Sequence, residues 1–336
     1  MRIKLLTLTI IVFVGLQLRL DAQDIHFSQF HMSPLTTNPG LTGNFLGTMR
    51  LGGIYRSQWG GILNKSYRTP SFYIDAPVIR GFRKQDWVGA GGVLYQDKAG
   101  NGNLTTGGLW FSAAYHLGLG KTAKQVLSVG LQYGIGQKQV NDIQNLTFFD
   151  GIESGGPSLD EGNISGDNTR YTDVNVGIVY TQKLTGDDKI HAGISAAHVS
   201  RGRATVLSAG GGGYRLPLRF VGYAAAETTM NERFKVRPAL QFQYMDSQYE
   251  LLLQAIGGYV INPEEQLTLL VGLGYRLQDA IIPYVGVDYK TFKVGLAYDL
   301  NASKLGAGTA FELAVSYIVR VVKKPTVKPV IFCPRF

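Results

Sequence analysis

Apolar and polar side chains alternate along the stretch TAFELAVSYIVR, residues 309–320. The apolar set is Phe311, Leu313, Val315, Tyr317 and Val319, and the polar set between them is Glu312, Ser316 and Arg320. A helix would scatter both kinds around its axis, whereas a strand places alternate side chains on opposite faces. The stretch therefore predicts a β-strand with one apolar and one polar face.

The same alternation recurs from about residue 46 onward, in segments that end at breaks rich in Gly, Asn, Asp or Lys. In VLSVGLQYGIGQ, residues 126–137, apolar side chains alternate with Ser, Gln and Gly. The predicted strands are 46–58, 67–78, 86–97, 103–117, 125–138, 170–183, 188–199, 215–229, 233–245, 248–261, 265–277, 280–289, 291–299 and 309–321. These are about fourteen, and an even number is the rule for single-chain bacterial outer-membrane barrels.

One predicted strand, FKVRPALQFQYM at residues 234–245, contains a proline on its apolar face. Proline has no backbone N–H to donate to a neighbouring strand. Pro238 therefore predicts a bulge or a weakly paired position.

The lengths of the breaks give an independent check on a barrel. Long breaks at 139–169, 200–214 and 300–308 follow the fifth, seventh and thirteenth predicted strands. Breaks after even strands, such as 185–189 and 230–233, are tight. In outer-membrane barrels the periplasmic turns are short and the extracellular loops are longer. All three long breaks are therefore expected on the extracellular side of the membrane.

The strand lengths favour a membrane-spanning barrel over a soluble β-sandwich. Strands in soluble sheets are mostly five or six residues long, whereas a tilted membrane-spanning strand needs about nine to eleven. We therefore expect the apolar faces to meet lipid and the polar faces to line a lumen, with Glu312, Arg320, Lys235 and Arg237 available to hold a plug by ion pairs. Aromatic residues near strand ends, namely Tyr55, Trp59, Trp87 and Tyr289, are candidates for the interface girdles, although chance placement explains any single one equally well.

Composition agrees with a lipid-exposed sheet. Charged residues make up 17% of the 336 residues, and the chain has 43 glycines, 18 tyrosines and 16 phenylalanines. The net charge of +9 is spread through turns and the C-terminal tail instead of forming one stripe, which argues against nucleic acid as a partner. A single cysteine, Cys333, cannot form an internal disulfide.

The first 22 residues have the pattern of an export signal. Arg2 and Lys4 precede an apolar run from Leu5 to Leu16, and cleavage is expected after Ala22. An uncleaved anchor is the alternative, but the run is shorter than the ~20 residues that a spanning helix needs.

Three segments do not follow the strand pattern. Residues 23–45 have two prolines and no alternation, and we expect them to plug the lumen or to lie beneath it in the periplasm. Residues 139–169 form a polar, acidic break. Residues 323–336 contain three prolines and are expected to be a short periplasmic C-terminal tail. The predicted organisation is thus a signal peptide at 1–22, the segment 23–45, an all-β transmembrane antiparallel barrel of about 14 strands at 46–322, and the tail.

Sites for chemistry are weak in this sequence. Asp24, His26 and His31 fit no regular metal-ligand spacing, so no metal is expected there. The acidic residues of 139–169 lack a recognisable calcium-loop spacing, and Gly210 to Gly213 precede no phosphate-binding motif. Without a nucleophile-elbow motif, we expect no enzyme, no catalytic residues and no cofactor.

Several motifs resemble those of one family. They are QDIHFSQFHMSPLTTNPGLTG at 23–43, YRSQWGG at 55–61, SFYIDAP at 71–77, GAGGVLYQDKAGNG at 89–102 and the ending CPRF. Over nearly the whole mature chain the sequence is similar to the PorP/SprF family of the type IX secretion system of Bacteroidota.

The resemblance implies a non-enzymatic outer-membrane component of protein secretion and gliding motility. It implies partners among periplasmic and outer-membrane secretion components, or a secreted protein with a C-terminal sorting domain, besides the lipid bilayer. Candidate partner-binding residues are His26, Phe27, Phe30, Arg56, Trp59, Lys323, Lys324, Lys328 and Arg335. A porin or solute transporter is the alternative, because it shares the barrel and the polar lumen.

Overall fold

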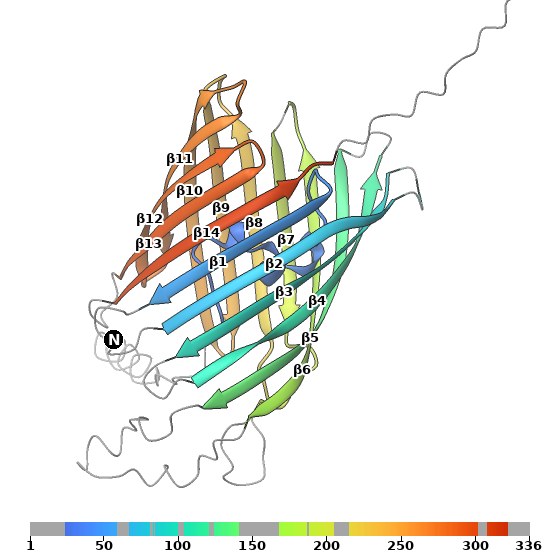
Figure 1. The fold of residues 1–336 in the computed structure, drawn as a ribbon, viewed down its shortest axis with the longest axis vertical. Coiled ribbons are helices and arrows are strands. Elements are labelled where there is room, and N and C mark those ends of the chain that lie inside the picture. Colours follow the sequence, from blue (N-terminus) through green and yellow to red (C-terminus); the bar gives the residue numbers. More distant parts are fainter. Residues whose placement is uncertain are drawn as a thin grey trace, which may run out of the picture.

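The computed structural model describes residues 24–58, 67–80, 83, 85–99, 104–120, 124–140, 168–186, 188–204, 215–301 and 308–321. Within these residues the chain forms fourteen antiparallel strands in one closed barrel (Figure 1), with β14 pairing with β1. The strands are β1 Met49–Gln58, β2 Tyr67–Arg80, β3 Trp87–Ala99, β4 Leu104–Leu119, β5 Gln125–Val140, β6 Thr169–Lys183, β7 Lys189–Ala197, β8 Arg219–Thr229, β9 Phe234–Met245, β10 Gln248–Asn262, β11 Leu267–Arg276, β12 Ala280–Tyr289, β13 Phe292–Asn301 and β14 Thr309–Val319. The predicted barrel and strand number are confirmed.

Each strand pairs with its neighbours in the sequence, so closure requires only the pairing of β1 with β14. Odd-numbered strands end at one rim, here called the loop end, where β5 connects to β6, β7 to β8 and β13 to β14. Even-numbered strands end at the other rim, here called the turn end, where the longest connection is 81–86. The three long breaks identified in the sequence therefore share one rim.

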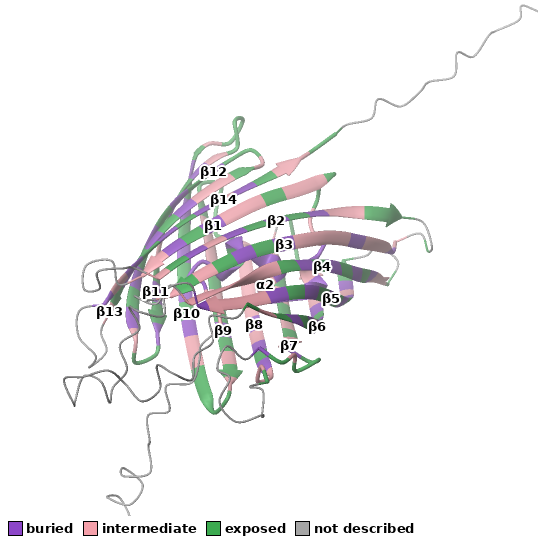
Figure 2. Cartoon of the chain, turned by 60° about the horizontal axis from the view of Figure 1, so that its bottom comes forward, coloured by how far each residue is buried: buried purple, intermediate pink, exposed green. Residues whose placement is uncertain are grey.

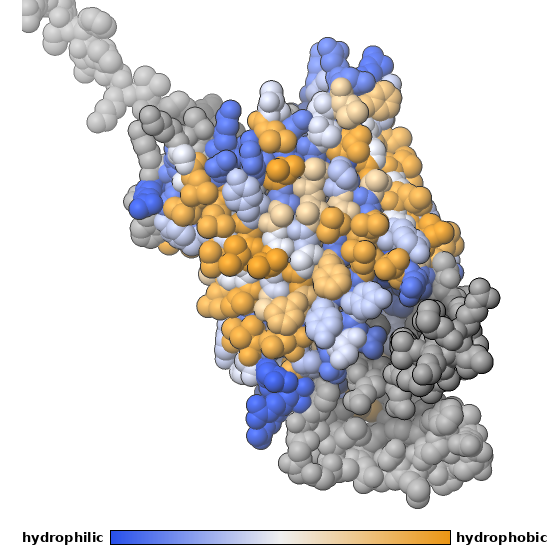
Figure 3. All heavy atoms as spheres, turned by 180° about the vertical axis from the view of Figure 1, so that it is seen from behind, coloured by the Kyte–Doolittle hydropathy of each residue, from blue (hydrophilic) through white to orange (hydrophobic). Residues whose placement is uncertain are grey.

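The period-two pattern separates the two faces of the wall (Figure 2). Strand β12 alternates strictly between buried and exposed positions along its whole length. In β14, Phe311 and Leu313 are exposed on the outer face, while Glu312 is 0% exposed. Figure 3 shows that apolar side chains cover much of the outer surface between the two rims. Because such a surface is stable only against lipid, the outer face is the membrane-facing one.

Two details differ from the sequence-based expectations, and a third follows one of two expected forms. Arg320 follows the end of β14 and is exposed, so its placement in the lumen was wrong. Pro238 makes no bulge against β10, but the ladder between β9 and β8 skips this position, so the expected weak pairing is found on that side, as a missing N–H requires. Trp87 faces inward and stacks on His116 at 4.6 Å between ring centroids, so it is not part of a girdle.

Helices contribute little to the described residues. They are η1 Phe30–Met32, α2 Pro34–Thr37 and η2 Pro39–Leu41. None of the helices in the described part of the chain has the length and apolar character needed to cross a bilayer.

A charge on the outer face is expected to destabilise the barrel in proportion to its depth. Leu131 lies near the middle of β5 and is 54% exposed. Leu131→Arg should lower the free energy of unfolding by about 2–4 kcal/mol, whereas Gln125→Arg at the strand end should cost less than about 1 kcal/mol. Urea titration of the protein in lipid vesicles measures both, and equal effects would contradict a membrane-facing surface.

Candidate functional site: a plugged lumen

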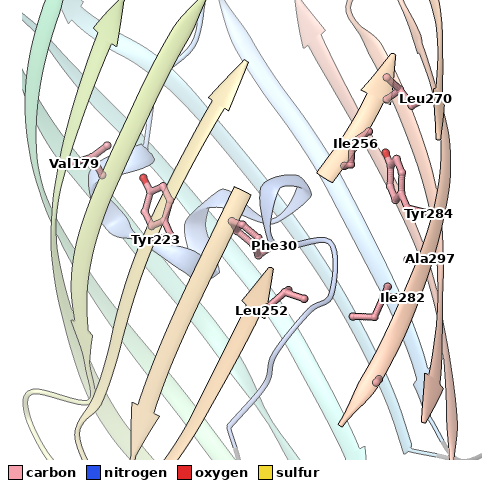
Figure 4. Packing of buried hydrophobic residues seen from close by; sticks show 10 residues of the cluster. Phe30, Val179, Tyr223, Leu252, Ile256, Leu270, Ile282, Tyr284 and Ala297 are labelled. Carbon is pink, nitrogen blue, oxygen red and sulfur yellow. The ribbon is translucent and has the colours of Figure 1, made fainter. Parts of the chain in front are cut away.

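Residues 24–43 lie inside the barrel, and we call them the plug. Figure 4 shows its short helices within the ring of strands. Side chains of the plug are almost fully enclosed, and Ser28, Gln29, Ser33, Asn38 and Thr42 are each 0% exposed. Of the two expectations for 23–45, a luminal plug is the one that the structure supports.

The two prolines begin short helices instead of preventing structure. Pro34 is at the first position of α2 and Pro39 at the first position of η2, where a missing N–H costs nothing. The side chain of Asn38 caps η2 by accepting a hydrogen bond from the Gly40 amide at 2.8 Å. The plug is therefore a chain of single helical turns, which a period-based search does not detect.

At the loop end, a charged cluster holds the first described residue of the plug. Asp24 forms an ion pair with Arg219 at 2.9 Å. The His198 ring donates to Asp24 at 3.1 Å and to Asp173 at 3.0 Å. Burial alone would lower the pKa of His198, but the two carboxylates outweigh burial and raise this pKa to about 9. At neutral pH His198 is a cation, so the cluster has two carboxylates and two cations.

A second charged cluster fixes the plug backbone to β14. The Glu312 carboxylate accepts hydrogen bonds from the amides of Ser28 at 2.7 Å and Gln29 at 2.9 Å. Arg56 forms ion pairs with Glu312 and, at 3.0 Å, with Asp299. Each backbone amide thus finds an ionised acceptor, which makes a stronger hydrogen bond than a neutral one.

Arg276 completes this cluster. Its guanidinium forms an ion pair with Asp299 at 3.0 Å and donates to the Ser28 hydroxyl at 2.6 Å. Arg276 also pairs with Asp279 at 2.9 Å and with Glu250 at 3.5 Å, so the two arginines face four carboxylates, of which Glu312 and Asp299 are buried. Such a cluster is favourable only while every member keeps its partners, because an unpaired buried charge is costly.

Near the middle of the barrel, the plug lies against the backbone atoms of the wall strands. The Asn38 amide group donates to the carbonyls of Ile178 and Ile194 at 3.2 and 2.9 Å. A Cβ atom added at Gly177 would lie 2.0 Å from the Asn38 side chain, and one at Gly130 would lie 2.3 Å from the Gly40 amide. Glycine is required at these two positions because the plug approaches the strands so closely.

At the turn end, the last residues of the plug are held again. His116 binds the Thr42 carbonyl at 2.8 Å, and Asp75 accepts from the Gly43 amide at 2.7 Å. Trp87 donates its indole N–H to the Gly43 carbonyl at 3.0 Å. Gly43 has a φ of +72°, which only glycine adopts without strain. The plug is therefore fixed along its whole length.

Apolar contacts add to the polar ones. Figure 4 shows Phe30 of the plug pointing into a cluster of inward-facing wall residues. Leu35 packs in a second cluster that includes Tyr73 and Trp110, and it is 1% exposed. Burial of a large apolar side chain stabilises a structure by about 1.5–3 kcal/mol.

Two small cavities lie beside the plug. One cavity has a volume of about 20 Å³ and lies between Asp24, Trp110 and Arg219. A second cavity of about 10 Å³ lies beside Phe27 and Phe30. A single water needs roughly 10–15 Å³, so these cavities hold a water molecule and not a solute.

The candidate partner-binding residues fall into two groups. His26, Phe27, Phe30 and Arg56 lie in the lumen, and the last three are at most 5% exposed. These side chains contact the barrel interior, and binding of a partner through them stays a prediction that requires the plug to move. Trp59, Lys323, Lys324, Lys328 and Arg335 lie outside the described residues, as do most of the acidic break and the Gly210 to Gly213 run.

Two further expectations concern charged groups of the lumen. Arg237 lines the lumen but pairs with Glu227 at 3.0 Å and Asp288 at 2.7 Å, both from the wall, so its predicted contact with a plug was wrong. The sequence trio Asp24, His26 and His31 is not brought together: Asp24 contacts Arg219, His26 lies 3.9 Å from Glu250, and His31 packs against Tyr284.

A closed antiparallel barrel with an apolar outer face and a polar, filled interior defines the class of outer-membrane β-barrel proteins. Within that class, the sequence profile described as type IX secretion system membrane protein PorP/SprF matches residues 20–317. The chain belongs to this family, as the motifs of its N-terminal half suggested. It is accordingly a membrane protein of the type IX secretion system.

Comparison with curated proteins gave no match. Among solved structures, the toluene transporter TbuX of Ralstonia pickettii superimposes with a TM-score of 0.51 at 13% identity, over 86% of this chain and 94% of that one. The toluene transporter TodX of Pseudomonas putida superimposes with a TM-score of 0.52 at 13% identity, over 85% of this chain and 92% of that one. The monoaromatic hydrocarbon channel CymD superimposes with a TM-score of 0.51 at 14% identity, over 85% of this chain and 92% of that one. At these identities the likeness shows a shared barrel fold.

Removal of the Glu312 carboxylate is expected to release the first part of the plug. Glu312→Ala leaves two backbone amides without their acceptor and removes one of the two carboxylates paired with Arg56, a change that costs about 3–5 kcal/mol at a buried ion pair. Limited proteolysis in detergent should therefore cut residues 24–32 at least about tenfold faster than in the wild type. Ser316→Ala is the matched control, because Ser316 lies on the same face of β14 and hydrogen-bonds Tyr73 of the wall. Equal cleavage rates in both variants would contradict the assigned role of Glu312.

Proposed function

We propose that this protein is a non-conducting and non-enzymatic component of the type IX secretion machinery. In this proposal it serves as a rigid binding platform in the outer membrane. The observation that carries the proposal is the plug, which is held by charged clusters at the loop end and by backbone contacts down to the turn end. A barrel whose lumen contains a plug fixed at several levels is suited to closing a path for a solute, and in this proposal other proteins bind at its rims.

In this proposal the polar side chains of the lumen have a different role from those of a porin. Porins keep a polar interior because water and solutes pass through it. Here the inward-facing Glu312, Asp75 and His116 are used to bind plug backbone atoms. The same alternation of side chains thus produces a filled interior, and the alternative of a solute transporter is disfavoured.

We place the loop end outside the cell and the turn end in the periplasm. Short turns face the periplasm in outer-membrane barrels, and every connection at the turn end is short. The tail 323–336 then begins in the periplasm, where Lys323, Lys324, Lys328 and Arg335 offer positive charge to a machinery component. Secreted proteins with a C-terminal sorting domain are proposed to be held at the opposite rim, at the cell surface. This arrangement presupposes export through a cleaved signal peptide.

Electrical recording separates a platform from a channel. In planar lipid bilayers the purified protein should show no stable conductance, because the plug leaves no continuous water path. Deletion of residues 24–45 should produce a stable open pore, which serves as the positive control. Heat-dependent mobility on gels establishes that the shortened barrel is folded. A stable open pore in the wild-type protein would overturn the platform proposal and favour a transporter.

Labelling of whole cells tests the orientation separately. In a Cys333→Ser background, Ser247→Cys places a thiol in the turn between β9 and β10 at the loop end, and Glu232→Cys places one at the turn end. A membrane-impermeant maleimide should label the first and not the second until the cells are broken. The reverse pattern would place the loop end in the periplasm.

A further inference from the structure

Charged side chains gather on the inner face of the wall where β7 to β13 reach the turn end. Lys189 is the first residue of β7, and Lys235 and Lys293 are the second residues of β9 and β13. Because odd-numbered strands begin at the turn end, these side chains lie just inside that mouth of the lumen. The complete set, which we call the mouth cluster, is Lys189, Glu227, Lys235, Arg237, Asp288 and Lys293.

The alternation within each strand places the mouth cluster on the inner face. In β7 the Ser195 hydroxyl donates to the Thr37 carbonyl of the plug at 2.8 Å, so Ser195 points inward. Lys189 is an even number of positions from Ser195 and therefore shares its face. The same counting from the buried residues of β8, β9, β12 and β13 places the other five members on the inner face.

Arg237 links two carboxylates of the mouth cluster. Its guanidinium pairs with Glu227 of β8 at 3.0 Å and with Asp288 of β12 at 2.7 Å. Lys189 pairs with the second oxygen of Glu227 at 3.1 Å, and Lys293 lies 3.8 Å from Asp288. Each carboxylate thus already serves two cations. With Lys235 included, the mouth cluster has four cations and two carboxylates.

The plug leaves this part of the wall accessible to solvent. Its last helix, η2, contacts β4, β5 and β6, which lie across the barrel from β11 to β13. The side chains of Lys189 and Lys293 are 44% and 37% exposed although they point into the barrel. His31 of the plug is exposed as well, and its ring lies 5.7 Å from that of Tyr284 on the inner face of β12. A ligand therefore reaches the mouth cluster from the turn end without displacing the plug.

The chain supplies little further negative charge to this space. Asp24 is the only acidic residue of the plug, and it is paired with Arg219 at the loop end. The turn-end connections contain one acidic residue outside the described residues, Asp187, and residues 322–336 contain four cations and no acidic side chain. Even a pairing of Asp187 with the mouth cluster would leave an excess of cations.

The spacing of the lysines indicates the shape of a ligand. Neighbouring strands lie about 4.8 Å apart, so Lys235 on β9 and Lys293 on β13 are separated by about 19 Å along the wall. A single phosphate ion does not span this distance, whereas an extended chain with several carboxylates does. Lysine also presents a single compact charge instead of the fork that grips one phosphate from two sides.

We propose that the mouth cluster binds an acidic peptide segment of a periplasmic protein. The inference rests on the proposed function, because only a platform whose turn end faces the periplasm meets such a partner. It adds the chemistry of that partner and the place where it binds. The lumen admits a chain segment at this mouth, so the folded part of the partner stays below the rim.

Titration of the purified full-length barrel with a model peptide tests the proposal. The protein in nanodiscs of zwitterionic lipid is mixed with a fluorescent, end-capped oligoglutamate peptide, and fluorescence anisotropy measures the affinity. Lys235→Gln combined with Lys293→Gln should weaken binding about tenfold, since each half-exposed ion pair contributes about two- to fivefold. Replacement of both lysines by arginine keeps the charges and should retain most of the affinity.

A matched control makes the same change of net charge across the mouth. Arg83 and Lys124 are exposed in the turn-end connections after β2 and β4, and Arg83→Gln with Lys124→Gln should leave binding unchanged. The proposal is overturned if both double variants lose affinity equally, or if neither does. It is also overturned if an oligoglutamine peptide binds equally well, or if inorganic phosphate competes at the same concentration as oligoglutamate.

Lysine footprinting locates the bound peptide without any substitution. Acylation of Lys189 and Lys293 should slow when the peptide is bound, whereas Lys124 should react at an unchanged rate. Unchanged acylation of Lys189 and Lys293 at saturating peptide would contradict the assigned site. A stable pore in the wild-type protein would overturn the platform without altering these measurements, so the failure of the proposed function and the failure of this site are distinguishable.

Discussion

The bond between a buried carboxylate of the wall and the backbone of the plug is the interaction on which the rest of the structure depends. A closed barrel with alternating faces leaves polar side chains inside, and those side chains need water or protein partners. Glu312 meets this need by accepting from two successive amides of the plug, while Arg56 balances its charge. Because acceptor and donors are both enclosed, neither part is satisfied without the other.

This mutual dependence changes what the barrel is suited to do. Charged clusters at Asp24 and Glu312 and the backbone contacts of Asn38 and Gly43 hold the plug at four levels between the rims. An interior fixed in this way resists deformation, because core packing and buried charge pairs tolerate only small displacements. In the proposed role, such a stiff barrel serves as an attachment point for the secretion machinery. Under that proposal, partner proteins bind at the rims of the barrel.

Much of the wall could be predicted from the sequence, because strand periodicity is a local property. The alternation in residues 126–137 and 309–319 is enough to assign strands and to tell which face is buried. The predictions for single side chains were wrong where a strand ended, or where the residue that the side chain contacts is distant in the sequence. Arg320 continues the alternation of β14 but lies one residue beyond the last paired position of that strand. Trp87 is an aromatic residue near a strand end, as girdle residues are, but its side chain contacts the plug.

The contacts of the plug could not be predicted in the same way. Ser28 and Glu312 are 284 positions apart, and no spacing rule joins such residues. The useful signal was weaker: an acidic residue at an inward-facing position of an apolar strand, as at Glu312, requires a buried partner. Asp75, Asp173 and Asp299 show the same signal and have partners in or near the plug. In this barrel, these inward-facing carboxylates bind the plug or residues beside it, but their positions in the sequence do not identify the segment that fills the lumen.

Hydrogen exchange of the wild-type protein in a lipid bilayer measures most directly whether the plug is held in the lumen. The amides of Ser28, Gln29 and Gly43 are bonded to buried carboxylates and should exchange as slowly as the amides of the central strands. Exchange of these three amides at the rate of an unstructured peptide, with the strands still protected, would contradict the account.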